Sequence, residues 1–132
     1  MTTFIDTSAF LAVLDADDLQ HRRAKKAWAD LIGSGDPLTT SSYVLIETLA
    51  LLQHRIGLEA VRTFHGDVMP VLQIEWVDAE THAAGMAGLL AASQRRLSLV
   101  DCVSFHLIRR AGIPRAFTLD RHFRVQGFAC IP

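Results

Sequence analysis

Short β-prone runs alternate along the chain with longer segments in which apolar residues recur every three or four positions. Short apolar runs bounded by turn residues indicate strands, whereas the longer period indicates amphipathic helices. The predicted strands are five short segments: residues 3–6, 38–40, 71–77, 116–119 and 128–131. The predicted helices are six longer segments: residues 8–14, 18–32, 42–56, 58–67, 78–93 and 98–111.

The limits of these helices come from residues that cap or break helical backbone. Serine or aspartate precedes most of the apolar segments, where its side chain can accept a bond from a free backbone N–H. Gly57 and Gly112 follow two of the helices, and residues 33–37 predict a loop. Strands separated by helices need crossover connections. We therefore expect an α/β fold with a mostly parallel central sheet of four to five strands, flanked by helices on both faces.

Composition is that of a small globular protein. The chain has 132 residues, 50% of them hydrophobic, which is enough apolar surface for one packed domain over residues 1–132. Glu47 interrupts the longest apolar stretch well short of the ~20 residues that cross a bilayer, so no membrane association is expected. The N-terminus lacks a basic start and an apolar signal core, and the expected compartment is the cytoplasm. Cys102 and Cys130 form no CxxC pair, and we expect reduced, mostly buried thiols.

Basic residues are clustered, although the formal net charge is only −1. Arg22-Arg23 stand close to Lys25-Lys26, and Arg121 stands close to Arg124. A polyanionic partner is therefore not excluded, but it would need a local basic patch. The first cluster, taken alone, is explained more simply as the solvated face of a helix.

Two acids directly follow predicted strands. Asp6 ends the first strand and Asp120 follows the fourth, and in parallel sheets the ligand crevice lies beyond the carboxyl ends of the strands. Each acid also has a purely structural explanation. Asp6 could cap the following helix, Asp101 could complete a capping box with Ser98, and Asp120 could shape a turn or cap the segment after it.

Glu47 and Asp101 are harder to explain structurally, because both lie on apolar helical stripes. An isolated carboxylate there suffers a large desolvation penalty, and no basic residue stands three or four positions from Glu47. Carboxylates ~5 Å apart repel by roughly 3 kcal/mol per pair at an effective dielectric of ~20, so their convergence requires a cation. Oxygen ligands without His or Cys ligand spacing favour Mg²⁺ or Mn²⁺.

A metal ion held by carboxylates suggests hydrolysis of nucleic-acid phosphodiester bonds. Asp6, Glu47, Asp101 and Asp120 would act as metal ligands. One of them, Glu47 or Asp101, could also assist deprotonation of the attacking water.

Four sequence motifs resemble those of the PIN-domain ribonucleases, most closely the VapC toxins of bacterial toxin–antitoxin systems. The motifs are IDTSAF from Ile5, SYVLIET from Ser42, LVDCVSF from Leu99 and AFTLDRHF from Ala116. The resemblance covers nearly the whole chain. It implies a sheet-centred fold with the acids in one groove, Mg²⁺- or Mn²⁺-dependent endoribonuclease activity, a homodimer, and inhibition by a small protein antitoxin.

The same resemblance assigns roles to individual residues. It makes Asp6, Glu47, Asp101 and Asp120 the acidic quartet, with Ser8 and Thr118 as supporting hydroxyls, although either hydroxyl could also be a simple cap. We further predict contacts from Arg121, His122 and Arg124 to RNA phosphate, with a solvated turn as the alternative. Trp28 and Trp76 could stack on bases, but packing is the commoner role of such residues, and Phe123 is expected in the core.

Two other functions are open to this sequence. One is a phosphotransferase or phosphatase forming an aspartyl-phosphate on Asp6, although Ser8 stands where the second acid of the usual DxDxT pattern would be. The other is an inactive or solitary PIN-like protein that binds or processes RNA without being a toxin. The intact acidic quartet argues against an inactive protein.

Overall fold

A five-stranded parallel sheet forms the centre of the computed structural model, which describes residues 1–132. The strands follow the order β3-β2-β1-β4-β5, and every neighbouring pair is parallel. Their bounds are β1 Thr3–Ile5, β2 Leu38–Ser41, β3 Gln73–Glu75, β4 Arg115–Phe117 and β5 Cys130–Ile131. The predicted α/β class and parallel sheet are confirmed.

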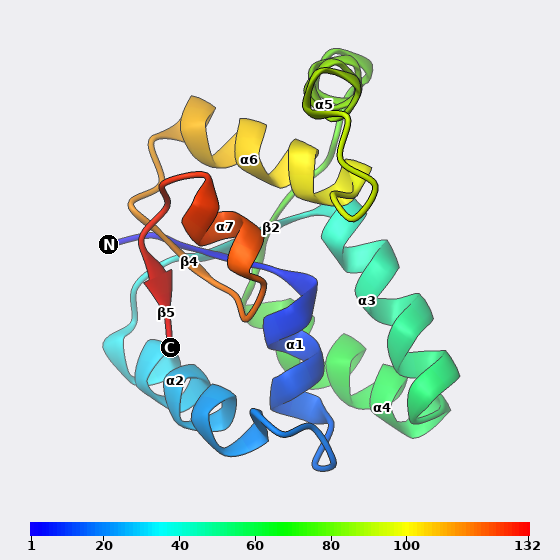
Figure 1. The fold of residues 1–132 in the computed structure, drawn as a ribbon. Helices are drawn as coiled ribbons and strands as arrows, with labels where there is room; N and C mark the ends of the chain where they lie inside the picture. The colour runs from blue at the N-terminus through cyan, green and yellow to red at the C-terminus, as the bar shows by residue number, and fades with distance from the viewer.

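Seven α-helices connect and cover the strands. They are α1 Thr7–Leu14, α2 His21–Ser34, α3 Ser42–Arg55, α4 Leu58–Thr63, α5 Ala79–Ala92, α6 Leu99–Ala111 and α7 Arg121–Val125. A π-helical turn, η1 Phe64–Val68, and a 3₁₀ turn, η2 Met69–Val71, follow α4. Figure 1 shows α1, α2 and α4 on one side of the sheet and α5 and α6 on the other, as expected.

Several predicted elements differ from the observed ones. The helix predicted over residues 58–67 is α-helical only as far as Thr63, where the π-helical turn η1 begins. The strand predicted over residues 71–77 shrinks to Gln73–Glu75, because Met69–Val71 forms the 3₁₀ turn around Pro70. The helix α2 begins at His21 because the Asp18 carboxylate accepts a bond from the Gln20 N–H, closing a turn ahead of the helix. The short helix α7 was not predicted, since five residues are too few to show a helical period.

The core is built around aromatic side chains from distant segments. The largest fully buried side chains include five phenylalanines: Phe4, Phe10, Phe64, Phe117 and Phe123. The expected core position of Phe123 is therefore confirmed. Trp28 packs edge-on against Phe10, with ring centroids 6.5 Å apart, whereas Trp76 is 68% exposed. Cys102 is buried, Cys130 is half-buried, and both are free thiols. None of the helices combines the length and the apolar character that a bilayer crossing requires.

Candidate active site

Two of the predicted acids meet where the chain changes direction across the sheet. From β1 the chain first builds β2 and β3 on one side, and it later returns to place β4 on the other side of β1. The crevice beyond the carboxyl ends of β1 and β4 is thus a topological switch point, the usual ligand site of such sheets. Asp6 follows β1 directly, and Thr118 and Asp120 follow β4.

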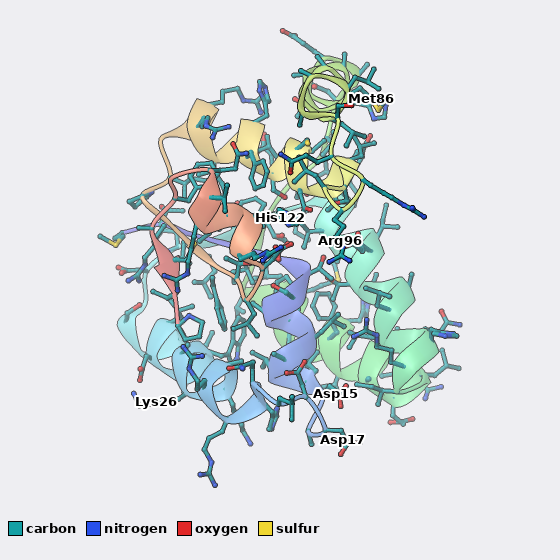
Figure 2. The ribbon with its side chains drawn as sticks, in the orientation of Figure 1. Asp15, Asp17, Lys26, Met86, Arg96 and His122 are labelled. Atoms are coloured by element: carbon teal, nitrogen blue, oxygen red, sulfur yellow. The ribbon has the colours of Figure 1, made fainter.

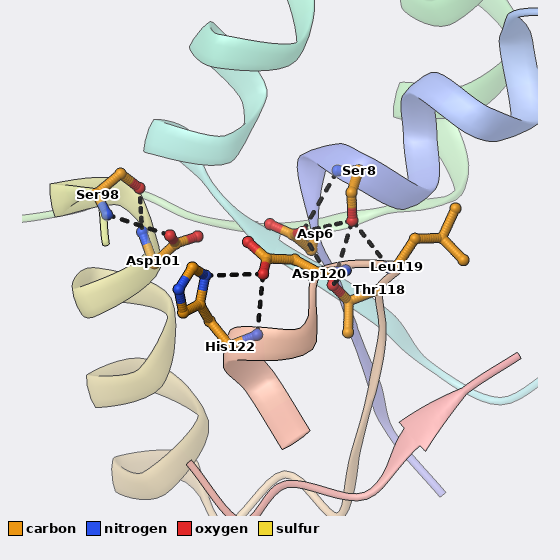
Figure 3. Close-up of polar contacts among 8 residues, drawn as sticks. All are labelled: Asp6, Ser8, Ser98, Asp101, Thr118, Leu119, Asp120 and His122. Carbon is orange, nitrogen blue, oxygen red and sulfur yellow. Dashed lines mark hydrogen bonds and ion pairs between the residues drawn. The ribbon is translucent and has the colours of Figure 1, made fainter. Parts of the chain in front are cut away.

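Asp6 is held by hydroxyl groups from both sides of this switch point (Figure 3). Its Oδ2 atom accepts bonds from the Ser8 hydroxyl at 2.7 Å, the Thr118 hydroxyl at 3.0 Å and the Ser8 N–H at 3.3 Å. The two hydroxyl oxygens accept in turn: Ser8 Oγ from the Leu119 N–H at 2.9 Å, and Thr118 Oγ1 from the Asp120 N–H at 3.0 Å. Ser8 and Thr118 therefore join the two loops as well as fixing the carboxylate.

The second oxygen of Asp6 is left for a ligand. Asp6 is only 4% exposed, yet its Oδ1 atom has no hydrogen-bond partner within the protein and is not sealed from solvent. Burial raises the pKa of Asp6 from 3.8 to about 6; the hydrogen bond from Ser8 opposes this rise, and the negative charge of Asp101 adds to it. A carboxylate in this setting favours either a proton or a nearby cation.

Asp101 is the electrostatic centre of the acidic cluster. It lies in the first turn of α6, where it completes a capping box: its Oδ2 accepts from the Ser98 N–H at 3.2 Å, and the Ser98 hydroxyl accepts from the Asp101 N–H at 3.0 Å. Burial raises the pKa of Asp101, and the charge of Asp120 raises it further. The charge of Asp101 in turn raises the pKa of both Asp6 and Glu47. All four acids therefore interact through this one residue.

Asp120 brings a histidine into the cluster. Its Oδ1 atom accepts from the His122 N–H at 2.9 Å and lies 2.9 Å from the His122 ring Nδ1 (Figure 3). Potential ligand atoms of Asp101, Asp120 and His122 all lie within 4.8 Å of one another. The sequence suggested His122 only as a phosphate contact. Its position two residues after an acid at a helix start was the available signal, because this spacing turns the ring back toward the cap.

Glu47 joins the site from α3. The structure places it in a half-buried position, so the expected inward orientation is only partly correct: it faces the groove rather than the core. Partial burial raises its pKa, and a hydrogen bond from the Thr7 hydroxyl opposes the rise. Asp6 and Glu47 lie outside the tight group formed by Asp101, Asp120 and His122.

A family model described as the PIN domain matches residues 3–129 of the chain. The chain belongs to the PIN-domain family. Over 127 residues it is 35% identical to the 23S rRNA-specific endonuclease VapC20 of Mycobacterium tuberculosis, a match that covers 95% of this chain and 94% of VapC20. The expected family and nuclease class are thereby confirmed.

Solved structures agree with this assignment. The crystal structure of M. tuberculosis VapC20, a sarcin–ricin loop cleaving toxin, superposes with a TM-score of 0.84 at 32% identity, and the match covers 98% of this chain and 97% of the VapC20 chain. VapBC2 of Rickettsia felis, bound to a promoter DNA fragment, gives 0.68 at 12% identity, covering 98% and 97%. FitAcB of Neisseria gonorrhoeae gives 0.69 at 14%, covering 100% and 97%. The last two likenesses concern the fold alone.

The donor set of this PIN domain fits a divalent cation. Asp6 offers a free, accessible carboxylate oxygen, and burial, together with the charge of a neighbouring acid, raises the pKa of Asp6, Glu47 and Asp101. Carboxylate oxygens at this density suit hard cations such as Mg²⁺ or Mn²⁺. The nearby His122 ring departs from the oxygen-only ligand set expected from the sequence.

The predicted phosphate contacts lie beside this cluster. Arg121 and Arg124 are exposed on α7, immediately after Asp120. Figure 2 shows His122 in the middle of the molecule, near the start of α1, whereas Asp15 and Asp17 lie at the far end of that helix. The acids of the loop after α1 are therefore not part of the site.

Proposed function

We propose that this PIN domain cleaves RNA internally with Mg²⁺ or Mn²⁺ held by Asp6, Glu47, Asp101 and Asp120. The observation that carries the proposal is that four carboxylates from separate segments lie close enough to interact. The charge of Asp101 raises the pKa of Asp6 and Glu47, and the charge of Asp120 raises the pKa of Asp101. Convergence of like charges is unfavourable without a cation. When bound, the ion would offset this repulsion and stabilise negative charge on the reacting phosphate.

The protein's own side chains would then orient the ligands and handle the proton. Ser8 and Thr118 hold one oxygen of Asp6, and Ser98 holds one oxygen of Asp101, so that the remaining oxygens stay in a fixed direction. Glu47 and Asp101 are the two candidates for accepting the proton of the attacking water, because burial raises the pKa of both carboxylates and so makes them better proton acceptors.

For the substrate, we propose a structured loop of ribosomal RNA. VapC20 is named as specific for 23S rRNA and is described as cleaving the sarcin–ricin loop, and its sequence aligns with 95% of this chain. Arg121 and Arg124 on the exposed face of α7 would contact RNA phosphates beside the acids. A ribosomal substrate would place the activity in the cytoplasm.

We also propose that the protein is the toxin of a toxin–antitoxin pair and works as a homodimer. VapC20 is described as a toxin. The structure of VapBC2 contains a chain whose fold matches 98% of this chain. A small protein antitoxin would inhibit by covering the acidic groove. The alternative is a solitary PIN-domain enzyme without such a partner.

The activity is tested by incubating purified protein with intact ribosomes and with total RNA, each with Mg²⁺, Mn²⁺ or EDTA. Primer extension then maps any cut. We expect a discrete cut in 23S rRNA with either metal, and no cut with EDTA or with Asp101→Asn. Equal integrity of the RNA with wild type and Asp101→Asn under every condition would refute the nuclease proposal.

The toxin role needs a separate test in cells. Induced expression of the wild type should arrest growth, and Asp101→Asn at equal protein level should not. Equal growth with both proteins would refute the toxin role while leaving the nuclease activity to the assay on RNA.

A further inference from the structure

A depression lies beside the acidic cluster, on the side of α2. It has a volume of about 240 Å³, and α2, the connection from β4 to α7, and α7 itself contribute its walls. Thr118 and Asp120 line it, so it opens directly beside the acids. Three arginines also line it: Arg23, Arg121 and Arg124. We call this depression the arginine pocket.

Two acidic groups accompany the three arginines of the pocket: the side chain of Asp120 and, at Pro132, the carboxyl group of the last residue of the sequence. None of the three arginines forms an ion pair with an aspartate or glutamate; Arg23 Nη1 donates to Gln20 Oε1 at 2.9 Å, and Arg124 Nη2 lies 3.5 Å from the Pro132 backbone oxygen. Asp120 itself already accepts from His122. Three guanidinium groups around one small hollow repel one another, and an anion in the hollow would relieve that repulsion.

We infer that the arginine pocket binds a single RNA backbone phosphate next to the one at which the strand is cut. The inference rests on the proposed ribonuclease function and adds Arg23 of α2 to the substrate contacts. Guanidinium groups suit this task because their planar fork donates two parallel hydrogen bonds to phosphate oxygens. Asp120 and Thr118 belong both to the acidic site and to the arginine pocket, so a phosphate in the pocket would lie directly beside the acids.

The basic cluster on α2 supports the same path for the RNA strand. A larger cavity of about 530 Å³ shares Arg23 with the arginine pocket and adds Lys26 and Arg115. Asp30 also lines this cavity and pairs with Lys26 at 3.0 Å, so Arg23 and Arg115 carry its unpaired positive charge. Arg23 and Lys26 stand three residues apart on one face of α2, whereas Arg22 and Lys25 line neither cavity. Figure 2 shows Lys26 on the outer part of α2, away from His122. All four basic residues are exposed, as the solvated-face explanation expects, and Arg23 in addition lines the arginine pocket.

Binding in the absence of cleavage is the first test. A short fluorescein-labelled oligouridylate is titrated with protein in EDTA, and its anisotropy is followed over a range of KCl concentrations. We expect Arg23→Ala and Arg121→Ala each to weaken binding about fivefold at low salt, and to lower the slope of log K against log[KCl] by about 0.7. Arg22→Ala is the matched control, since it removes the same charge from the same helix outside the pocket.

Cleavage kinetics give a second readout. A phosphate contact that is equal in the ground state and the transition state changes KM and leaves kcat unchanged. We expect Arg23→Ala to raise KM for the mapped RNA substrate about fivefold at wild-type kcat. A series of substrates is then made in which each member carries one neutral methylphosphonate in place of one phosphate. The substitution that weakens binding to the wild type should not weaken binding to Arg23→Ala any further.

The outcomes separate the pocket from the proposed function. If Arg23→Ala matches Arg22→Ala in affinity, salt slope and KM, the pocket does not bind phosphate, whatever the enzyme cleaves. If the wild type cleaves no RNA with either metal, but Arg23→Ala still lowers the affinity and salt slope for the oligouridylate, the ribonuclease proposal fails and the phosphate site stands.

Discussion

Neutralising Asp6 should make the metal-free protein more stable at neutral pH. Burial raises the pKa of Asp6 from 3.8 to about 6, so the folded chain binds the proton more tightly than the unfolded chain does. The stabilisation from this proton is fully present below about pH 4, and it is lost as the pH rises through about 6. Two pKa units correspond to about 3 kcal/mol of unfolding free energy.

Asp6→Asn removes this cost with little change in shape. The amide oxygen can still accept from the Ser8 and Thr118 hydroxyls. The amide NH₂ takes the place of the free carboxylate oxygen and removes the repulsion between Asp6 and Asp101. At pH 7.5 in EDTA we expect the variant to exceed the wild type by up to about 3 kcal/mol, or roughly 10 °C in Tm. Near pH 4 the difference should vanish, because Asp6 of the wild type is then protonated.

Urea unfolding followed by circular dichroism, from pH 4 to 8 in EDTA, measures this difference. Asp67→Asn is the control, since Asp67 is an exposed carboxylate away from the groove. Mg²⁺ at 100 times its Kd should cancel most of this difference, because it adds about 2.7 kcal/mol to the wild type, which binds it. An Asp6→Asn variant no more stable than the wild type at pH 7.5 in EDTA would refute the claim that the charged, buried Asp6 carboxylate destabilises the metal-free fold.

Three further predictions concern the site and its supporting frame. Asp120→Asn should lower RNA cleavage at least about 100-fold in Mg²⁺ while retaining RNA binding in EDTA, measured by gel assay and anisotropy; unchanged cleavage would remove Asp120 from the ligand set. Ser8→Ala should lower the unfolding free energy by about 1–2 kcal/mol, because the Leu119 N–H loses its acceptor and Asp6 loses a donor. Gly85→Ala should cost about 1–3 kcal/mol, since its Cβ would lie 2.4 Å from Val103 Cγ2, whereas Gly88→Ala, with its nearest atom at 3.9 Å, should not destabilise; equal melting temperatures of the two variants would contradict this.

The sequence was sufficient for the sheet because each strand is bounded by strong signals. Short β-prone runs between capped helices predict parallel strands, and the right-handed crossover rule limits their order. The location of Asp6 and Asp120 followed from the same reasoning, since both stand directly after a strand. The predicted groove therefore came from chain order and needed no knowledge of side-chain positions.

Contacts between distant segments could not be predicted in this way. The Ser8 and Thr118 hydroxyls meet on one oxygen of Asp6 across 110 residues of sequence, and this depends on the register of β1 against β4. The arginine pocket likewise requires α2 and α7 to face each other. In the sequence Arg23 looked like any other basic residue on a solvated helix. The helical period predicts which residues share a face, but it does not predict which other element lies against that face.

The capping explanation of three of the acids is confirmed, and the observed caps are compatible with the proposed metal site. Asp6 caps α1, Asp101 completes the capping box of α6, and Asp120 caps α7. Each of these bonds uses one named oxygen: Oδ2, Oδ2 and Oδ1, respectively. The backbone thus fixes the direction of the other oxygen, and the positive ends of the helices favour the charged carboxylate there. Capping is in this way the device that orients the candidate ligands, so removing a capping partner such as Ser8 or Ser98 should disturb metal binding as well as stability.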